Sequence, residues 1–245
     1  MNLRESNYYS LKANQEYFSV SQYKDFAKCE AMAMAKLAGE YEQPMTRALL
    51  VGSFVDAYFE ETINDFIKRH PEIYTLKSEL RSEFRKANDI IKKVQNDELF
   101  VKFMSGEKQR IITFELFGTK WKMKMDSYLP NICITDLKIL ANFKNIPLWG
   151  YDLQGAIYQK GVELVDGAAL PFYLAVATKE RVIDTDIFHI TQKYLDRALK
   201  EIENSIGRYI AVKQGLFKPK RCGVCDYCKS TKKATIRNYS ELMEV

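Results

Sequence analysis

The chain has 245 residues, of which 47% are hydrophobic and 28% are charged. This composition is typical of a folded globular protein and excludes collagen-like, low-complexity and wholly disordered chains. The 37 basic and 32 acidic residues give a formal net charge of +5, which is too small to identify a nucleic-acid partner by itself. We expect a single domain over residues 1–245, because this length lies at the upper end of what usually stays one domain.

The sequence predicts a cytoplasmic protein with no membrane partner. It contains no apolar stretch of the roughly 20 residues that a membrane span needs, and its polar N-terminus does not resemble a secretory signal. The five cysteines are not expected to form disulfides in a reducing compartment.

The first part of the chain, residues 1–105, is expected to be mainly helical. Apolar residues recur there at helical spacing. Ser19 and Ser21 are suitable N-caps for the first helix. The predicted helices cover residues 22–37, 46–69 and 82–94.

The pattern changes to strands within residues 106–190, which are expected to form a sheet that carries the catalytic residues. Strands are predicted over residues 110–117, 120–129, 132–137, 171–178 and 182–189, and helices over residues 148–164 and 192–212. The order α-β-β-β-α-β indicates an α/β protein of the α+β type, with a mixed sheet and helices packed against it. Residues 191–245 would form the last helix and a tail rich in cysteine and lysine.

Two carboxylates and a lysine fall on neighbouring predicted strands. If these strands pair as a hairpin, residue 126 lies opposite about residue 135, so Asp126 and Asp136 reach the same end of the sheet. Lys138 follows on the same strand face as Asp136. Carboxylate oxygens suit Mg²⁺, which takes its other ligands from water and phosphate, and the lysine could orient an attacking water. A lone Asp-x-Lys more often marks an exposed strand edge, but the second aspartate argues against that interpretation.

These residues resemble the PD-(D/E)xK nuclease superfamily, in particular its RecB-like and exodeoxyribonuclease VIII-like phage exonucleases. The family's α-β-β-β-α-β core matches the predicted order, so the resemblance covers nearly the whole chain. It implies a restriction-endonuclease-like fold with N-terminal helices and a Cys-rich C-terminal tail. It also implies a deoxyribonuclease that uses Mg²⁺ or Mn²⁺. Asp126 and Asp136 would hold the metal, the Leu137 carbonyl could add a ligand, and Lys138 would serve the attacking water.

Two further motifs support this resemblance. Residues 50–56, LVGSFVD, look like the family's helical motif, in which a metal-binding side chain follows a glycine by four residues. Relatives usually carry histidine at that place, and this chain carries Asp56, which is chemically a good Mg²⁺ ligand. Gln154 and Tyr158 match the family's Gln-x-x-x-Tyr signature and share one helix face, from which they would support the site by contacting DNA or the catalytic lysine.

The cysteines predict a metal centre. Cys222, Cys225 and Cys228 form a C-x2-C-x2-C motif. Residues 21–30 resemble the N-terminal segment of RecB-like nucleases, whose cysteine joins three C-terminal cysteines around an iron-sulfur cluster, so the resemblance implies Cys29 as the fourth ligand. Four thiolates suit a [4Fe-4S] cluster or a tetrahedral Zn²⁺, and both alternatives stay open. Cys133 lies in an apolar run and is expected in the core.

The tail is also basic. Eight basic residues and one acidic residue lie between Lys213 and Arg237. Such a patch suits a phosphate backbone, so Lys229, Lys232 and Lys233 are predicted to contact nucleic acid. The alternative is a solvated tail that keeps the protein soluble.

The sequence as a whole predicts a metal-dependent phosphodiester hydrolase. By resemblance it is a DNA exonuclease of a phage or prophage recombination module that resects duplex ends, acts as a homo-oligomer and leaves a single strand for an annealing protein. Two alternatives are a catalytically weak DNA-binding or assembly protein on the same fold, and a RecB-like endonuclease. The chain has two histidines, far from any nucleophile pattern, and no Walker motif, which argues against a Ser/His or Cys/His hydrolase and excludes a Walker-type motor within these residues.

Overall fold

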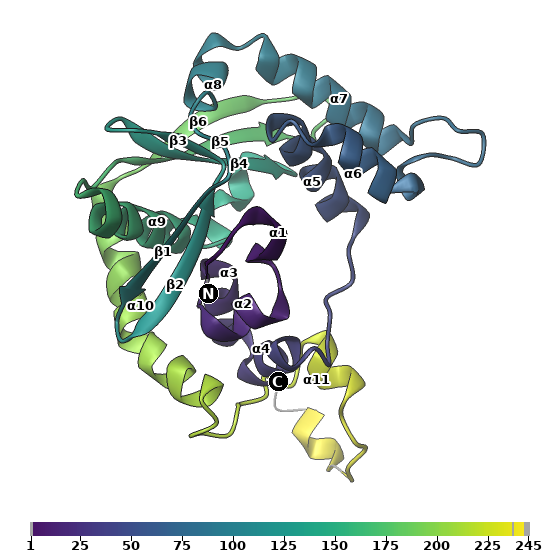
Figure 1. Ribbon diagram of the computed structural model, residues 1–245. Coiled ribbons are helices and arrows are strands. Elements are labelled where there is room, and N and C mark those ends of the chain that lie inside the picture. The colour runs from purple at the N-terminus through teal and green to yellow at the C-terminus, as the bar shows by residue number, and fades with distance from the viewer. Residues whose placement is uncertain (1, 237, 243–245) are drawn as a thin grey trace.

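The computed structural model describes residues 2–236 and 238–242 (Figure 1). A four-stranded mixed sheet has helices on both faces, and a separate two-stranded sheet lies beside it. The strands are β1 (Arg110–Leu116), β2 (Thr119–Met125), β3 (Ser127–Leu129), β4 (Cys133–Leu140), β5 (Phe172–Thr178) and β6 (Thr185–Ile190).

Helices precede, interrupt and follow these strands. The α-helices are α1 (Glu5–Tyr8), α2 (Leu11–Glu16), α3 (Val20–Lys28), α4 (Glu30–Ala38), α5 (Arg47–Phe59), α6 (Ile63–Arg69), α7 (Ser82–Gln95), α8 (Glu98–Phe103), α9 (Tyr151–Asp166), α10 (Gln192–Lys213) and α11 (Asp226–Ser230). The 3₁₀ helices are η1 (Pro71–Ile73), η2 (Phe143–Leu148) and η3 (Tyr239–Leu242). Within residues 2–236 and 238–242, no helix is long and apolar enough to cross a membrane.

The four-stranded sheet has the order β3-β4-β5-β6. Its central strands β4 and β5 run parallel, and both outer pairs run antiparallel. Helix α9 connects the parallel pair, as such a crossover requires. The predicted mixed sheet with its α-β-β-β-α-β order is therefore confirmed.

The alternation of side chains along β5 divides the core into two layers. Phe172, Leu174 and Val176 pack with α9 and α10 on one face, whereas Ala175 and Ala177 pack with α5 and α7 on the other. Gly155 lets α9 approach the sheet closely, because a Cβ atom there would lie 2.6 Å from the Phe172 ring. The sheet is thus held between α5 and α7 on one side and α9 and α10 on the other (Figure 1).

Three predicted elements are broken in the structure. The helix predicted over residues 22–37 is α3 and α4, because Cys29 adopts an extended conformation with φ −166°. The helix predicted over residues 46–69 is α5 and α6, because Glu61 between them has a left-handed φ of 60°. The strand predicted over residues 120–129 is β2 and β3, which pair with different strands. Hydrophobic periodicity does not register such breaks, since the apolar pattern continues across them.

The other predicted elements agree with the structure within about three residues, and the short helices α1, α2 and α8 were not predicted. The N-terminal segment packs beside β2. Phe18 donates its N–H to the Lys120 carbonyl at 2.8 Å, and Lys122 donates its N–H to the Phe18 carbonyl at 2.7 Å. The buried Lys122 ammonium also donates to Asn14 Oδ1 at 2.7 Å. These bonds fix α2 and the residues that follow it beside β2.

Candidate active site and cysteine centre

Asp126 lies at the break between β2 and β3. Its Oδ2 accepts a 2.9 Å hydrogen bond from the N–H of Leu137 on β4. Strand β3 pairs with β4 so that Ser127 faces Thr135, and this register brings Asp126 beside Asp136. The tight turn between β3 and β4 therefore places Asp126 and Asp136 side by side. The observed pairing differs by one residue from the expected one, in which residue 126 lay opposite about residue 135.

Asp136 and Lys138 form an ion pair on β4. Asp136 is 2% exposed, and its Oδ2 contacts the Lys138 ammonium. Burial alone would lower the pKa of Lys138, but the negative charges of Asp136 and Asp126 outweigh burial and raise that pKa. The Lys138 ammonium also lies 5.4 Å from the centre of the Tyr151 ring. Lys138 is therefore a fixed positive charge and hydrogen-bond donor.

Helix α5 brings two more carboxylates to this site from the opposite layer. Asp56 and Glu60 are one helical turn apart and line a small pocket together with Asp126 and Leu137. Glu60 Oε1 lies 4.0 Å from the Lys124 ammonium. The Glu60 side chain is only 22% exposed and faces this pocket.

The pKa values of Asp56 and Asp126 are both raised. Burial is the largest cause for both Asp56 and Asp126, and repulsion from neighbouring carboxylates adds to it. A cation bound among these carboxylates would relieve this repulsion, as protonation does without one. Oxygen donors suit a hard divalent ion such as Mg²⁺ or Mn²⁺. Among the described residues, however, only the four cysteines bring three or more ligand atoms within 4.8 Å of one another.

Gln109 is a further polar residue of this pocket that the sequence analysis missed. Its Oε1 atom is buried without a hydrogen-bond partner, and the side chain lines the same pocket as Asp56 and Asp126. The residue has a left-handed φ of 54°, which is uncommon outside glycine. The backbone conformation just before β1 brings Gln109 here, and no motif in the sequence signals it.

Gln154 and Tyr158 lie on α9, as predicted, but contact different groups. The Gln154 side-chain amide donates to Asp136 Oδ1 at 2.6 Å, whereas the Tyr158 hydroxyl donates to the backbone carbonyl of Lys124 at 2.9 Å. Burial raises the pKa of Tyr158, so the phenol stays protonated as a donor. In the structure neither side chain hydrogen-bonds Lys138; Gln154 orients its partner carboxylate, and Tyr158 connects α9 to β2.

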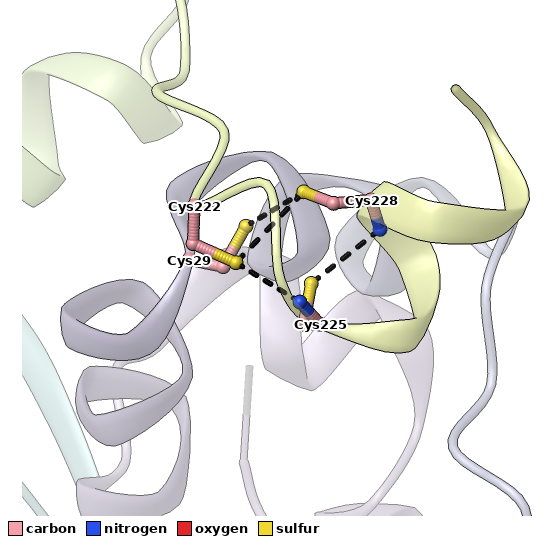
Figure 2. A group of neighbouring side chains, drawn as sticks. All are labelled: Cys29, Cys222, Cys225 and Cys228. Atoms are coloured by element: carbon pink, nitrogen blue, oxygen red, sulfur yellow. Dashed lines mark hydrogen bonds between the residues drawn. The ribbon is translucent and has the colours of Figure 1, made fainter. Parts of the chain in front are cut away.

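The four predicted cysteine ligands converge in space (Figure 2). The sulfur atoms of Cys29, Cys222, Cys225 and Cys228 all lie within 4.8 Å of one another. Cys29 Sγ is 3.6 Å from Cys228 Sγ, and Cys222 Sγ is 3.9 Å from Cys228 Sγ. Backbone N–H donors, that of Cys225 foremost, lower the pKa of the Cys222 thiol to about 6. Burial raises the pKa of the Cys225 thiol to about 12, and a metal ion bound among the four sulfur atoms would favour their thiolate form. Cys133 is buried in β4, as expected.

Hydrogen bonds to Glu30 hold both α10 and the tail against α4 beside this cluster. The Arg208 guanidinium makes two hydrogen bonds of 3.0 Å to the Glu30 carboxylate, and the Lys220 N–H donates to the same carboxylate at 2.7 Å. These charged hydrogen bonds, with that of Arg208 as the first cause, lower the pKa of Glu30. The extended conformation of Cys29 and the docking of the tail on Glu30 thus occur at neighbouring residues.

The basic tail divides into structural and exposed residues. Lys213 does not belong to the exposed patch, because its ammonium donates to the carbonyls of Asn14 and Tyr17. Lys229, Lys232 and Lys233 are exposed, and α11, with the segment after it, lies away from the β4 and α5 site (Figure 1). Arg237 lies outside the described residues.

Comparison with known proteins identifies a family and a similar solved structure. Residues 19–231 match the model of a PDDEXK-like domain of unknown function (DUF3799). The chain is 45% identical to a "putative exonuclease" from Eubacterium rectale, whose crystal structure superposes with a TM-score of 0.96 over 99% of this chain and 98% of that chain. A second solved structure, of SSO0001, is 14% identical over 76% of this chain and 83% of that chain, and its TM-score of 0.31 is too low to indicate a shared fold. No curated protein matches the sequence.

Proposed function

The chain belongs to the PDDEXK-like family DUF3799, as its resemblance to the PD-(D/E)xK nucleases predicted, and from this premise we propose that it is a divalent-metal-dependent deoxyribonuclease. The observation that carries the proposal is the meeting of Asp126, Asp136 and Lys138 at one buried point of the sheet. Oxygen ligands beside a fixed ammonium suit the hydrolysis of a phosphodiester, in which negative charge develops on phosphoryl oxygens.

Each side chain has a separate role in this proposal. Asp56, Asp126, Asp136 and the Leu137 carbonyl would hold Mg²⁺ or Mn²⁺. The ion supplies positive charge that stabilises the phosphoryl oxygens and activates water. Lys138 orients the attacking water and lends positive charge, since its raised pKa keeps it protonated. Gln154 holds Asp136 Oδ1, and Tyr158 anchors the helix that carries Gln154.

The most specific form of the proposal is an exonuclease that resects the ends of duplex DNA. Support comes from the solved structure that is 45% identical, whose name describes an exonuclease. A place in a phage or prophage recombination module, a homo-oligomeric assembly and delivery of a single strand to an annealing protein complete the proposal. These three elements rest on the resemblance to exodeoxyribonuclease VIII-like proteins.

For the cysteine centre we propose a single Zn²⁺ rather than a [4Fe-4S] cluster. Thiolates around one tetrahedral zinc, with Zn–S bonds of about 2.3 Å, lie about 3.8 Å apart. The sulfur separations of 3.6 and 3.9 Å agree with this value. A cluster of four irons and four sulfides would need more room between the same thiolates. The zinc would join the C-terminal tail to the junction of α3 and α4.

The test compares end-labelled linear duplex DNA with closed circular DNA, each in Mg²⁺ and in EDTA. We expect the linear DNA to be shortened from its ends only in Mg²⁺ and the circle to stay intact. Asp136→Asn, Asp126→Asn and Lys138→Ala should each abolish cleavage in folded protein. Cutting of the closed circle would replace the exonuclease by an endonuclease, and normal cleavage by folded Asp136→Asn protein would overturn the catalytic assignment.

A further inference from the structure

A second pocket, of about 200 Å³, adjoins the carboxylate site. Three lysines and no carboxylate line it: Lys24, Lys122 and Lys124. Gln154 lines this pocket as well and makes the 2.6 Å hydrogen bond to Asp136. Lys124 is paired with Glu60 at 4.0 Å, so the positive charge of the pocket comes mainly from Lys24 and Lys122. Gln154 connects the pocket to the Asp136 carboxylate.

The start of helix α3 forms one wall of this pocket. Ser19, Val20 and Ser21 line it, and α3 begins at Val20 after the N-cap Ser19. The first N–H groups of a helix have no carbonyl partner within the helix, and the helix dipole makes this end positive. Ser19 Oγ accepts from the Gln22 N–H at 3.2 Å, whereas the Ser21 side chain is exposed. Helix N-termini of this kind bind phosphate groups.

Lys24 adds an ammonium that has no acidic partner. It donates to the Trp149 carbonyl at 2.8 Å, and within residues 2–236 and 238–242 no carboxylate forms an ion pair with it. Burial, with the positive charge of Lys138, lowers the pKa of Lys24 to about 8. A bound anion would offset both effects, so this ammonium is suited to receive one.

The aromatic side chain of Tyr9 lines the pocket. The Tyr9 ring is 69% exposed and lies 5.1 Å from the Lys124 ammonium. Neighbouring Tyr8 is held in place, because the buried Lys122 ammonium donates to its carbonyl. Exposed aromatic rings next to a basic groove are typical of sites that stack the bases of single strands.

We propose that this pocket binds a phosphate group of the DNA strand being cut, next to the phosphate that is hydrolysed, with the attached base stacked on Tyr9. The ammonium of Lys24 and the N-terminus of α3 bind the phosphate, and Lys122 and Lys124 contribute positive charge. The inference rests on the proposed nuclease function, because it makes this pocket part of the substrate path. The phosphate is either a terminal monoester or an internal diester, and both present non-bridging phosphoryl oxygens to these groups.

The test uses variants of the full-length protein and binding of labelled DNA in buffer without Mg²⁺ or Mn²⁺, where no cleavage occurs. Lys24→Met removes the charge and keeps most of the stem, and Lys28→Met makes the same change at the exposed far end of α3. We expect Lys24→Met to weaken binding about tenfold and to reduce the salt slope by roughly 0.7 to 0.9 for one lost phosphate contact. Lys24→Arg should restore most of the affinity, and Lys28→Met should change neither quantity.

Ser21→Asp separates DNA binding from folding. A carboxylate in the first turn of α3 favours the helix, so thermal stability should be kept or raised, while the added negative charge should repel the phosphate and weaken DNA binding. DNA with 5′-phosphate, 3′-phosphate or hydroxyl ends distinguishes the two sources. If Lys24→Met weakens the binding only of DNA with one kind of phosphorylated end, the pocket binds a terminal monoester. If it weakens the binding of DNA with all three ends equally, the pocket binds an internal diester.

The outcomes also separate this pocket from the nuclease assignment. If Lys24→Met and Lys28→Met bind DNA with equal affinity and equal salt slopes, the pocket is not a phosphate site, whether or not the wild-type protein cuts DNA. If Lys24→Met weakens DNA binding and Lys28→Met does not, but the wild-type protein never cleaves DNA in Mg²⁺ or Mn²⁺, the pocket is a phosphate site and the proposed nuclease function is wrong.

Discussion

Gln154 on α9 donates a 2.6 Å hydrogen bond to Oδ1 of Asp136 on β4. This bond crosses from the helix to the sheet that it covers, and it leaves Oδ2 of the same carboxylate to contact Lys138. Under the proposed function, in which Asp136 binds the metal ion, Gln154 would influence metal affinity without binding the ion itself.

The first prediction concerns this bond. Gln154→Leu should lower Mg²⁺-dependent cleavage by about 10- to 100-fold, because a freed Asp136 binds the ion less well. Part of the loss should be recovered at high Mg²⁺ concentration, as a metal titration of the cleavage rate would measure. Glu163→Gln, which alters a partly exposed residue of the same helix, is the matched control. Equal metal dependence of the wild-type and Gln154→Leu proteins would remove this role from Gln154.

The second prediction concerns the pH dependence of stability without added Mg²⁺ or Mn²⁺. Because burial and neighbouring carboxylates raise the pKa of Asp126 in the folded state, the contribution of Asp126 to stability should fall as pH rises from about 4, the usual carboxyl range, through that raised pKa. Asp126→Asn cannot lose a proton there. It should therefore be more stable than wild type at pH 8, by about 1.4 kcal/mol per unit of pKa difference, and no more stable near pH 3. Thermal unfolding of both proteins across this pH range measures the effect. A wild-type protein that is at least as stable as Asp126→Asn at pH 8 would contradict the prediction.

The third prediction concerns the cysteine centre. Wild-type protein should be colourless with about one equivalent of zinc by elemental analysis, and a strong chelator should lower its melting temperature, since a structural metal contributes folding energy. Cys29→Ser and Cys225→Ser should each lose the zinc. Cys133→Ser changes a buried cysteine outside the cluster and should retain it. Brown protein containing iron would exclude the zinc assignment, and metal-free folded protein would exclude a metal centre.

The fourth prediction concerns the exposed lysines of the tail. Replacing Lys229, Lys232 and Lys233 together by glutamine should weaken DNA binding and flatten its salt dependence by roughly 0.9 in slope per lost contact on duplex DNA. The same replacement of Lys92, Lys93 and Lys102, which are exposed on α7 and α8, controls for net charge. Identical slopes for the two triple variants would show that the tail acts only as a solvated appendage.

The sequence was sufficient for features that depend on neighbouring residues. The hydrophobic periods predicted the element order, and a short turn between two strands was enough to bring Asp126 near Asp136, because antiparallel pairing follows directly from such a turn. Lys138 is two residues from Asp136, so it had to emerge on the same strand face. Cys222, Cys225 and Cys228 are three residues apart, so their closeness in the sequence also predicted a cluster.

Contacts between distant segments were decided only by the tertiary structure. Cys29 meets Cys228 across 199 positions of sequence, which a family resemblance suggested but no spacing rule contains. The breaks at Cys29 and Asp126 are invisible to hydrophobic periodicity, because each residue leaves its regular element for a contact made elsewhere in the fold. Gln109 and the Lys24 pocket gave no signal at all in the sequence. Local pattern determines which elements form, and packing of those elements determines which polar side chains share a site.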